Sequence, residues 1–150
     1  MNIKLGEGIG PVQFGITKSK TIELLGVPDK VYETDSKCER FQFNDILLEL
    51  SFEPDNENLL GWIEVHNPDA ELFGLRLFGK TKEEVSALLT EQLKYAPETD
   101  DYGSMVSLSY DNHWLELQFE FDRLKCINFG VLYDNSDSPI WPTQKRSGIR

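Results

Sequence analysis

Two segments of the chain carry apolar residues at helical spacing, and each segment follows a threonine. Because a threonine oxygen accepts hydrogen bonds from the amides of a first turn, Thr17 and Thr81 are expected to cap two helices. Glu84 adds a Thr-x-x-Glu capping box to the second helix. We expect the first helix to end at Gly26 and the second to run to about Lys94. The apolar positions that define these helices are Ile22, Leu24, Leu25, Val85, Leu88 and Leu89.

After each helix the pattern changes to an alternation of apolar and polar residues, which is typical of strands with one buried face. Each alternating region predicts three strands, with hairpin turns expected at Asn44-Asp45 and Asp111-Asn112. The central strand of each region is expected at Leu47–Glu53 and at Trp114–Phe121. The side chains expected in the core are Phe41, Phe43, Leu48, Leu50, Phe52, Ile63, Val65, Val106, Leu108, Tyr110, Leu115, Leu117, Phe119, Phe121, Ile127 and Phe129.

The two patterned regions also match each other in sequence. FGITKSKTIELL begins at Phe14 and FGKTKEEVSALL at Phe78, an offset of 64, while LLELSFE and WLELQFE match at an offset of 67. A helix with three strands has an apolar face too small to bury alone, so two such units can share one core. The sequence therefore predicts a single α+β domain of two tandem pseudo-repeats, about 10–70 and 74–134, with a C-terminal tail at 135–150. Each repeat is expected to be a helix followed by three antiparallel strands, with the helices on one face of the sheet.

Charge narrows the partners that such a fold could have. The 150 residues include 26 acidic and 15 basic ones, which gives a formal net charge of −11. A field of this sign repels nucleic-acid phosphates and anionic lipids and attracts basic proteins. We therefore expect a basic protein partner, no nucleic acid and no membrane. The alternative is that the charge serves solubility alone.

Three features of the sequence favour a cytoplasmic location. No apolar run approaches the roughly 20 residues that cross a bilayer. The N-terminal MNIKLGEGIG lacks the apolar stretch of an export signal. Cys38 and Cys126 are too few for a disulfide framework, which fits a reducing compartment.

The segment GIGPVQFGITKSKTIELLGVPD, from Gly8 to Asp29, resembles the G-I-G-P…G-(M/I)-(T/S)…LG-x-P phrase of a family of small bacterial proteins. The tandem helix-plus-sheet plan is similar to the β-lactamase inhibitor protein fold, and the related outer-membrane barrel-assembly lipoproteins begin with such a helix. The resemblance covers most of the chain as a plan, with specific letters only in this segment and in Phe78 to Leu89. It implies a non-catalytic module that binds through its sheet face.

Motifs that carry chemistry are missing from the sequence. It has no Gly-x-Ser-x-Gly elbow, no HExxH and no phosphate-binding loop. His66 and His113 lie at non-equivalent positions of the two repeats, and Cys126 lies on an expected strand where a buried, inert thiol is the usual case. We therefore expect no catalytic residue, no metal site and no cofactor. The alternative is a small-ligand sensor or enzyme with a pocket near His66 or His113.

The polar positions of the alternating regions define a sheet face opposite the core. Large aromatic side chains among carboxylates are unusual on a solvent-facing sheet and are typical of protein-binding hot spots. The predicted partner-binding residues are Leu47, Glu49, Trp62, Glu64, Trp114, Glu116 and Gln118, with Asp100, Asp101 and Tyr102 in an adjoining loop. Two alternatives remain: the tail, with Ile140 and Trp141, covers this face, or two chains pair there.

These observations together favour a cytoplasmic bacterial binding protein that is not an enzyme. The expected function is that of an inhibitor, such as the immunity protein of a toxin, which binds a basic protein and is itself a monomer or homodimer. A pocket lined by His66 or His113 together with a carboxylate would favour the small-ligand alternative. A flat or concave sheet face without a pocket would favour inhibition.

Overall fold

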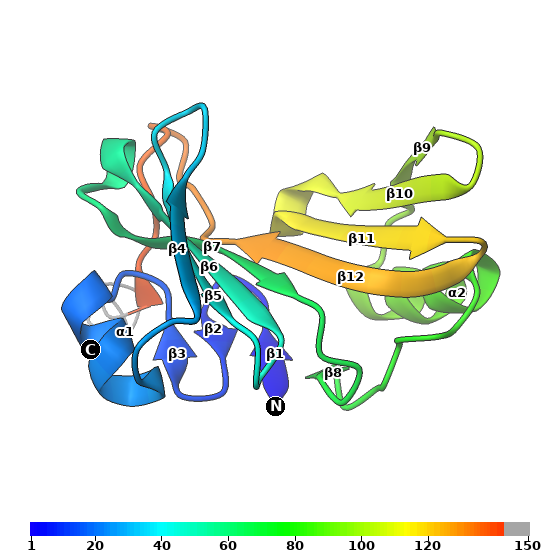
Figure 1. Cartoon of the computed structure of the whole chain (residues 1–150). Coiled ribbons are helices and arrows are strands. Elements are labelled where there is room, and N and C mark those ends of the chain that lie inside the picture. Colours follow the sequence, from blue (N-terminus) through cyan, green and yellow to red (C-terminus); the bar gives the residue numbers. More distant parts are fainter. Residues whose placement is uncertain (143–150) are drawn as a thin grey trace.

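The computed structural model describes residues 1–142 as two helices and two sheets, a mixed α+β fold in which most strands are antiparallel (Figure 1). The large sheet has the strand order β4-β5-β6-β7-β12-β11-β10-β9, and all its neighbouring strands are antiparallel. Its strands are β4 (Lys30–Glu33), β5 (Glu39–Phe43), β6 (Leu48–Glu53), β7 (Leu59–Val65), β9 (Glu98–Asp101), β10 (Met105–Tyr110), β11 (Leu115–Glu120) and β12 (Arg123–Gly130). We call β4 to β7 the first half of this sheet and β9 to β12 the second half; they meet at the β7–β12 pair.

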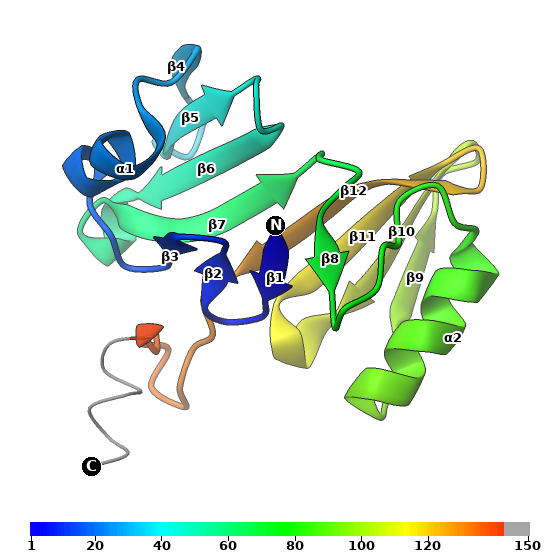
Figure 2. The same cartoon turned by 90° about the horizontal axis from the view of Figure 1, so that it is seen from below.

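The small sheet has the order β3-β2-β1-β8, and its β1–β8 pair is parallel. Its strands are β1 (Asn2–Lys4), β2 (Gly8–Ile9), β3 (Val12–Gln13) and β8 (Glu71–Leu72). Helices α1 (Lys18–Leu25) and α2 (Lys82–Leu93) lie on the same side of the large sheet as the small sheet (Figure 2). The opposite face of the large sheet, which we call the outer face, is covered by neither helix.

Both helices begin where the sequence predicts. The Thr17 hydroxyl accepts from the Lys20 amide at 3.0 Å, and the Thr81 hydroxyl accepts from the Glu84 amide at 3.2 Å. The first helix stops at Gly26, whose φ of 86° suits glycine because it has no Cβ.

The helices bury different kinds of side chain. Helix α2 buries Val85 and Leu89, as its apolar spacing predicts. In α1 the one buried residue is Thr21, whose hydroxyl donates to the Thr17 carbonyl at 2.9 Å. Ile22 and Leu24, which helped to predict this helix, are each 38% exposed. An eight-residue helix turns too few side chains inward to bury every apolar one.

The alternation correctly predicts the inward side chains of the central strands. Those buried are Leu48, Leu50, Phe52, Leu115, Leu117 and Phe119. Phe121 is an incorrect prediction: it lies beyond the end of β11 in a turn, with a φ of 49°, and is 74% exposed. Each helix is followed by four strands of the large sheet, one more than predicted, because the edge strands β4 and β9 were missed.

Two register shifts explain why the alternation breaks within the sheet. The β6–β7 register shifts between Ser51 and Phe52, and the β11–β12 register shifts between Gln118 and Phe119. A bulge inserts one extra residue and reverses the facing of the strand beyond it. Inward side chains can therefore be three residues apart, as in the buried pairs Leu60 with Ile63 and Leu124 with Ile127.

Candidate binding face

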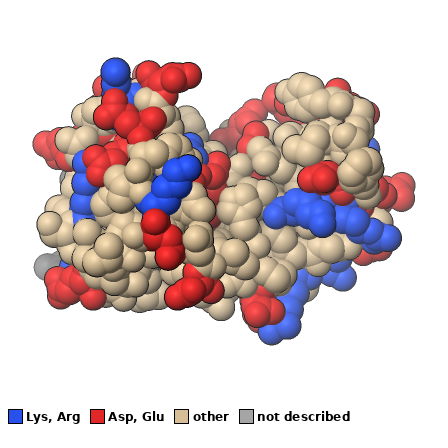
Figure 3. Space-filling model, viewed as in Figure 1, with Lys and Arg blue, Asp and Glu red and all other residues tan. Residues whose placement is uncertain are grey.

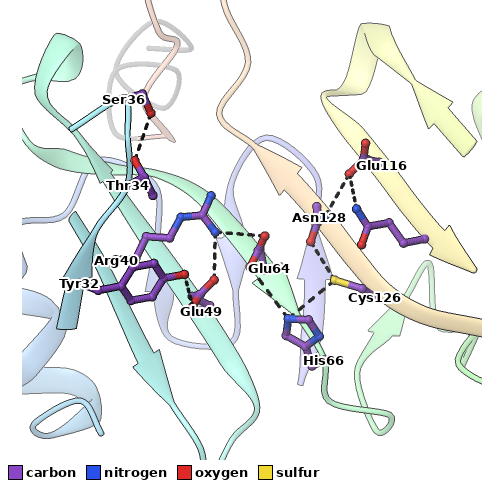
Figure 4. Close-up of polar contacts among 11 residues, drawn as sticks. Tyr32, Thr34, Ser36, Arg40, Glu49, Glu64, His66, Glu116, Cys126 and Asn128 are labelled. Carbon is purple, nitrogen blue, oxygen red and sulfur yellow. Dashed lines mark hydrogen bonds and ion pairs between the residues drawn. The ribbon is translucent and has the colours of Figure 1, made fainter. Parts of the chain in front are cut away.

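The centre of the outer face holds a compact charge cluster around Arg40. Its Nη1 lies 2.9 Å from Glu49 Oε2 and 3.1 Å from Glu64 Oε1, and the Tyr32 hydroxyl donates to Glu49 Oε1 at 2.7 Å (Figure 4). The three charged side chains come from β5, β6 and β7 and are only 20%, 13% and 22% exposed. Glu49 and Glu64, both predicted to bind a partner, are thus occupied by contacts within the chain.

The cluster shifts the pKa values of its members in different directions. Contact with His66 and the ion pair with Arg40 lower the pKa of the Glu64 carboxyl to about 2, against the opposing effect of burial. Burial and the nearby Glu64 carboxylate raise the pKa of Glu49. Glu64 Oε2 lies 4.0 Å from His66 Nε2 and raises the pKa of this histidine above its ordinary value of 6.5. Protonated His66 therefore adds a second positive charge beside Glu64.

Polar contacts continue from this cluster across the junction of the two halves. His66 Nε2 lies 3.8 Å from the Cys126 sulfur, and the Cys126 thiol donates to Asn128 Oδ1 at 2.9 Å. The Asn128 amide donates to Glu116 Oε1 at 3.1 Å, and the Gln118 amide donates to the same oxygen at 3.0 Å. Figure 4 shows this succession of side chains running from β7 through β12 to β11.

Glu116 differs from Glu49 in what neutralises it. The two glutamates hold the same place in the matched segments LLELSFE and WLELQFE. Glu49 contacts a guanidinium, whereas Glu116 accepts from two neutral amides, those of Gln118 and Asn128. Among residues 1–142 no basic side chain forms an ion pair with Glu116. Its negative charge therefore remains available on the outer face.

The two predicted tryptophans meet at one depression of about 280 Å³ beside Glu116. Gly130 lies between them in the sheet: it pairs with Trp62, and its amide donates to the Trp114 carbonyl at 3.0 Å. A Cβ at Gly130 would lie 2.7 Å from a ring carbon of Trp62, so the missing side chain leaves room for that indole. Trp114 is 46% exposed and packs on Tyr133 with ring centroids 5.0 Å apart. We call this depression the tryptophan pocket; its lining is Trp62, Trp114, Ser109, Asp111, Leu115 and Glu116.

A second depression of about 280 Å³ lies at the β5–β6 turn. Its lining includes Leu47, Glu49 and His66, so the third predicted apolar contact lies apart from the tryptophans. Leu47 is 44% exposed and has a φ of 53°.

The predicted loop residues Asp100, Asp101 and Tyr102 do not join the tryptophan pocket. They lie where β9 ends and turns into β10, and Asp101 accepts from the Gly103 amide at 2.8 Å. The pairing of β10 with β11 puts this turn at the end of β10 opposite Trp114.

His113 and Cys126 have surroundings that differ from those of a catalytic pair. The Tyr95 hydroxyl lies 2.8 Å from His113 Nδ1, and the rings stack with centroids 5.6 Å apart. His113 also lines a depression of about 520 Å³ with Glu7 and residues of β1 and α2, on the helix side of the large sheet. Burial, with nearby carboxylates, raises the pKa of the Cys126 thiol to about 12, so it stays protonated and unreactive at neutral pH. Within residues 1–142 no group of three or more His, Cys, Asp or Glu is placed to hold a metal ion.

The beginning of the predicted tail leads away from the outer face. Ile140 donates to the Leu132 carbonyl at 2.7 Å, and the Trp141 indole packs closely on Gly15, just before α1. Trp141 therefore packs on the segment just before α1. It does not cover Trp62 or Trp114. The rest of the tail, 143–150, lies outside the described residues.

Sequence reasoning missed four members of the outer-face network: Tyr32, Arg40, Cys126 and Asn128. A signal existed for two of them. Arg40 precedes the inward Phe41, and Asn128 stands between the inward Ile127 and Phe129. Both positions therefore had to face outward. Tyr32 lies on an edge strand without alternation, and the bulge beside Cys126 hides its facing.

The space-filling view shows a notch between the lobe that carries β4 and the lobe that carries β9 and β10 (Figure 3). The chain is thus a mixed α+β protein whose large sheet has one face, the outer face, that carries no helix. None of the helices in residues 1–142 is long and apolar enough to cross a membrane.

No protein-family model and no curated protein matches the sequence. Two solved structures are similar in fold. A DUF4309 family protein (YjgB) from Bacillus subtilis subsp. subtilis str. 168 has 18% identity and a TM-score of 0.53 over 84% of this chain and 88% of that chain. An extracellular protein containing an SCP domain from Bacillus anthracis str. Ames has 10% identity and a TM-score of 0.50 over 88% of this chain. The chain spans about half the length, 51%, of the latter. At these identities the likeness concerns the fold alone.

Proposed function

We propose that the chain is a non-catalytic binding protein that holds a basic protein partner on its outer face. The observation that carries this proposal is the tryptophan pocket, where two indoles border a glutamate without a cation of its own in residues 1–142. Tryptophan is enriched among residues that dominate binding energy, and carboxylates nearby steer a basic partner toward it.

More specifically, the proposed partner is a toxin, and the chain inhibits it by binding. A small, acidic chain with few cysteines and no catalytic motif is typical of immunity proteins, and the resemblance to β-lactamase inhibitor proteins points to the same mode of action. Cytoplasmic location is also part of the proposal, because Cys38 and Cys126 are free thiols. Cell fractionation with an antibody tests the location, and recovery of the chain outside the cell would contradict it.

A tandem origin of the two halves of the large sheet is a further part of the proposal. In each half a helix is followed by four consecutive strands, and a bulge interrupts the same pair of strands. Superposition of 10–70 on 74–134 in an experimental structure tests this origin. Halves whose strands do not align in order would contradict it.

The binding experiment compares two aromatic residues that share a backbone conformation. Trp114 and Phe121 both have a φ of 49°, and both are exposed. A tagged chain captures its partner from native lysate, and affinity is then measured with purified components. Trp62→Ala or Trp114→Ala should weaken binding about thirtyfold, since a hot-spot tryptophan contributes about 2 kcal/mol. Phe121→Ala, the matched control, should leave the affinity within about twofold.

Two outcomes of this experiment decide the proposal. Folded Trp62→Ala and Trp114→Ala variants that bind with wild-type affinity would overturn it. The loops at Asp100–Tyr102 and Asp134–Asp137 would then be the next candidates. Reversing the charge of Glu116, which borders both indoles, should slow association and also weaken the complex itself.

One observation favours the second candidate function, a small-ligand sensor or enzyme. His66 and Glu49 line one depression, and His113 and Glu7 line another, so both histidines have a carboxylate within the same hollow. A ligand that shifts the NMR signals of either histidine, and whose effect disappears in His66→Ala or His113→Ala, would establish this function. With no such ligand, both variants should keep partner binding within a few-fold.

A further inference from the structure

We propose that the tryptophan pocket receives the guanidinium group of an arginine from the protein partner. This inference rests on the proposed function, because it names the chemistry that the outer face recognises. It concerns one site, formed by Trp62 of β7, Trp114 beside β11 and Glu116 of β11.

The first argument is the charge of the lining. The pocket has two carboxylates, Asp111 and Glu116, and no basic side chain. Neither carboxylate forms an ion pair with any residue of 1–142. A cation that enters the pocket therefore meets negative charge without first displacing a basic side chain of the described residues.

The second argument is the shape of the walls. Trp62 and Trp114 offer indole surfaces, and tryptophan is the aromatic side chain that attracts cations best. The planar guanidinium stacks on aromatic rings and also donates to carboxylates in a fixed fork geometry. The volume of about 280 Å³ is sufficient for one guanidinium-bearing side chain.

The third argument comes from the other half of the same sheet. There Glu49, the counterpart of Glu116 in the matched segments, already binds a guanidinium, that of Arg40. Arg40 pairs with Ser51 across β5 and β6, and the residue that pairs with Gln118 across β10 and β11 is Ser107. The second half thus has a serine where the first has its arginine. An arginine from a partner would supply the missing counter-charge.

The test uses N-acetyl-arginine amide as the probe and N-acetyl-citrulline amide as a control of the same shape without charge. Binding is followed by NMR of the indole N–H signals of the chain's three tryptophans. Trp141 packs at Gly15, away from the pocket, and serves as an internal reference. We expect saturable shifts of the Trp62 and Trp114 signals with the arginine probe, and a Trp141 signal that does not move. The citrulline probe should bind at least about tenfold more weakly.

Matched variants test the role of the carboxylate. Glu116→Gln should weaken binding of the arginine probe about tenfold, because the charge is lost while the shape is kept. Glu120→Gln removes the same charge from an exposed position of the same strand and should change binding less than about twofold. Equal binding of the arginine and citrulline probes, or equal effects of these two variants, would overturn the proposal.

Other occupants give distinct results. If replacing Lys145, Arg146 and Arg150 by glutamine tightens probe binding about tenfold, the chain's own basic residues compete for the pocket, and a partner arginine is wrong. If the chain sediments as a dimer that Glu116→Gln dissociates, a second copy is the occupant, and the inference fails likewise. A partner whose binding needs Trp114, and whose binding is weakened when the arginine probe saturates the chain, supports the inference. A partner that needs Trp114 while the free chain binds no arginine probe overturns the inference and leaves the proposed function standing.

Discussion

The two halves of the large sheet treat the same glutamate position in opposite ways. In the first half Glu49 contacts Arg40 and Tyr32 and is largely covered. In the second half Glu116 accepts only from the amides of Gln118 and Asn128. In the first half the glutamate is therefore neutralised by an arginine of the same chain. In the second half no basic residue of 1–142 pairs with the glutamate, which lies beside two indoles.

This difference separates residues that stabilise the sheet from residues that we propose bind a partner. Six partner-binding predictions cluster on the outer face around the junction of the halves, yet their roles differ: Glu49, Trp62, Glu64, Trp114, Glu116 and Gln118. Glu49 and Glu64 are held by Arg40, so changing them would damage the fold. Trp62, Trp114 and Glu116 line an open depression, so changing them should affect binding more than stability.

The largest expected effect comes from removing the arginine of the first half. Arg40→Met leaves Glu49 and Glu64 close together without a counter-charge, and breaking a buried pair costs about 3–5 kcal/mol. Partial exposure reduces this, so we expect a loss of about 2–3 kcal/mol in the free energy of unfolding at pH 7. Urea denaturation measures it. Arg123→Met, at an exposed arginine of the second half, is the control and should cost less than about 1 kcal/mol. Equal losses would contradict the comparison.

The next effect concerns a pair of glycines, one in each half. Gly130→Ala places a Cβ 2.7 Å from the Trp62 ring, whereas at Gly61 the closest atom is a carboxylate oxygen of Glu53 at 2.8 Å. The Trp62 indole is a rigid ring, whereas the Glu53 carboxylate is the end of a flexible side chain and moves more easily. We expect Gly130→Ala to cost about 1–2 kcal/mol and Gly61→Ala less than about 1 kcal/mol in thermal or urea unfolding. A larger loss at Gly61 would show that Trp62 adjusts freely.

A third prediction concerns pH and the titration of His66. Glu64 raises the pKa of His66, so the protonated form stabilises the fold below the ordinary pKa of 6.5. That stabilisation is lost as the pH rises through the raised pKa, and solvent exposure keeps it below about 1 kcal/mol. Glu64→Gln should lower the pKa of His66, whereas the same change in the second half, Glu116→Gln, should leave it unaltered. NMR titration of the His66 ring distinguishes the two variants, and identical titration curves would disprove the role of Glu64.

The smallest expected effect comes from giving the second half an arginine of its own. Ser107→Arg introduces the basic residue that Arg40 provides at the matching position of the first half. A partly exposed ion pair with Glu116 should change the free energy of unfolding by less than about 0.5 kcal/mol. It should nevertheless weaken binding of the arginine probe about tenfold, since Glu116 is then neutralised. Ser107→Gln, similar in length but uncharged, is the control, and equal weakening by both would mean that bulk alone is responsible.

Much of this fold could be predicted from the sequence because its central strands alternate regularly. Leu48, Leu50 and Phe52 repeat at intervals of two, so the core face of β6 is unambiguous. The small sheet could not be found in this way, because strands of two or three residues, such as β2 at Gly8–Ile9, are too short to show a period. The edge strand β4 was missed because three of its four side chains are exposed, so its sequence shows no alternation.

The candidate site was predicted in part for a similar reason. Alternation placed Trp62 and Glu116 on the outer face, and in the structure they line one depression. Alternation could not reveal that Arg40 forms ion pairs with Glu49 and Glu64. A contact between side chains on neighbouring strands depends on the register of those strands, which alternation does not give. Trp114 lies outside the strand, and its left-handed backbone turns it toward Tyr133.

The composition of β9 affects whether two copies of this chain can pair edge to edge through their large sheets. This strand forms one border of the large sheet, all four of its residues are exposed, and three of them are acidic, namely Glu98, Asp100 and Asp101. A free border strand offers unpaired amides and carbonyls that can recruit another strand, and closely spaced charges prevent this by repelling an identical border. Asp100 and Asp101 are therefore expected to oppose pairing of β9 with the same strand of a second chain. Their replacement by threonine would favour end-to-end assembly of sheets at high protein concentration.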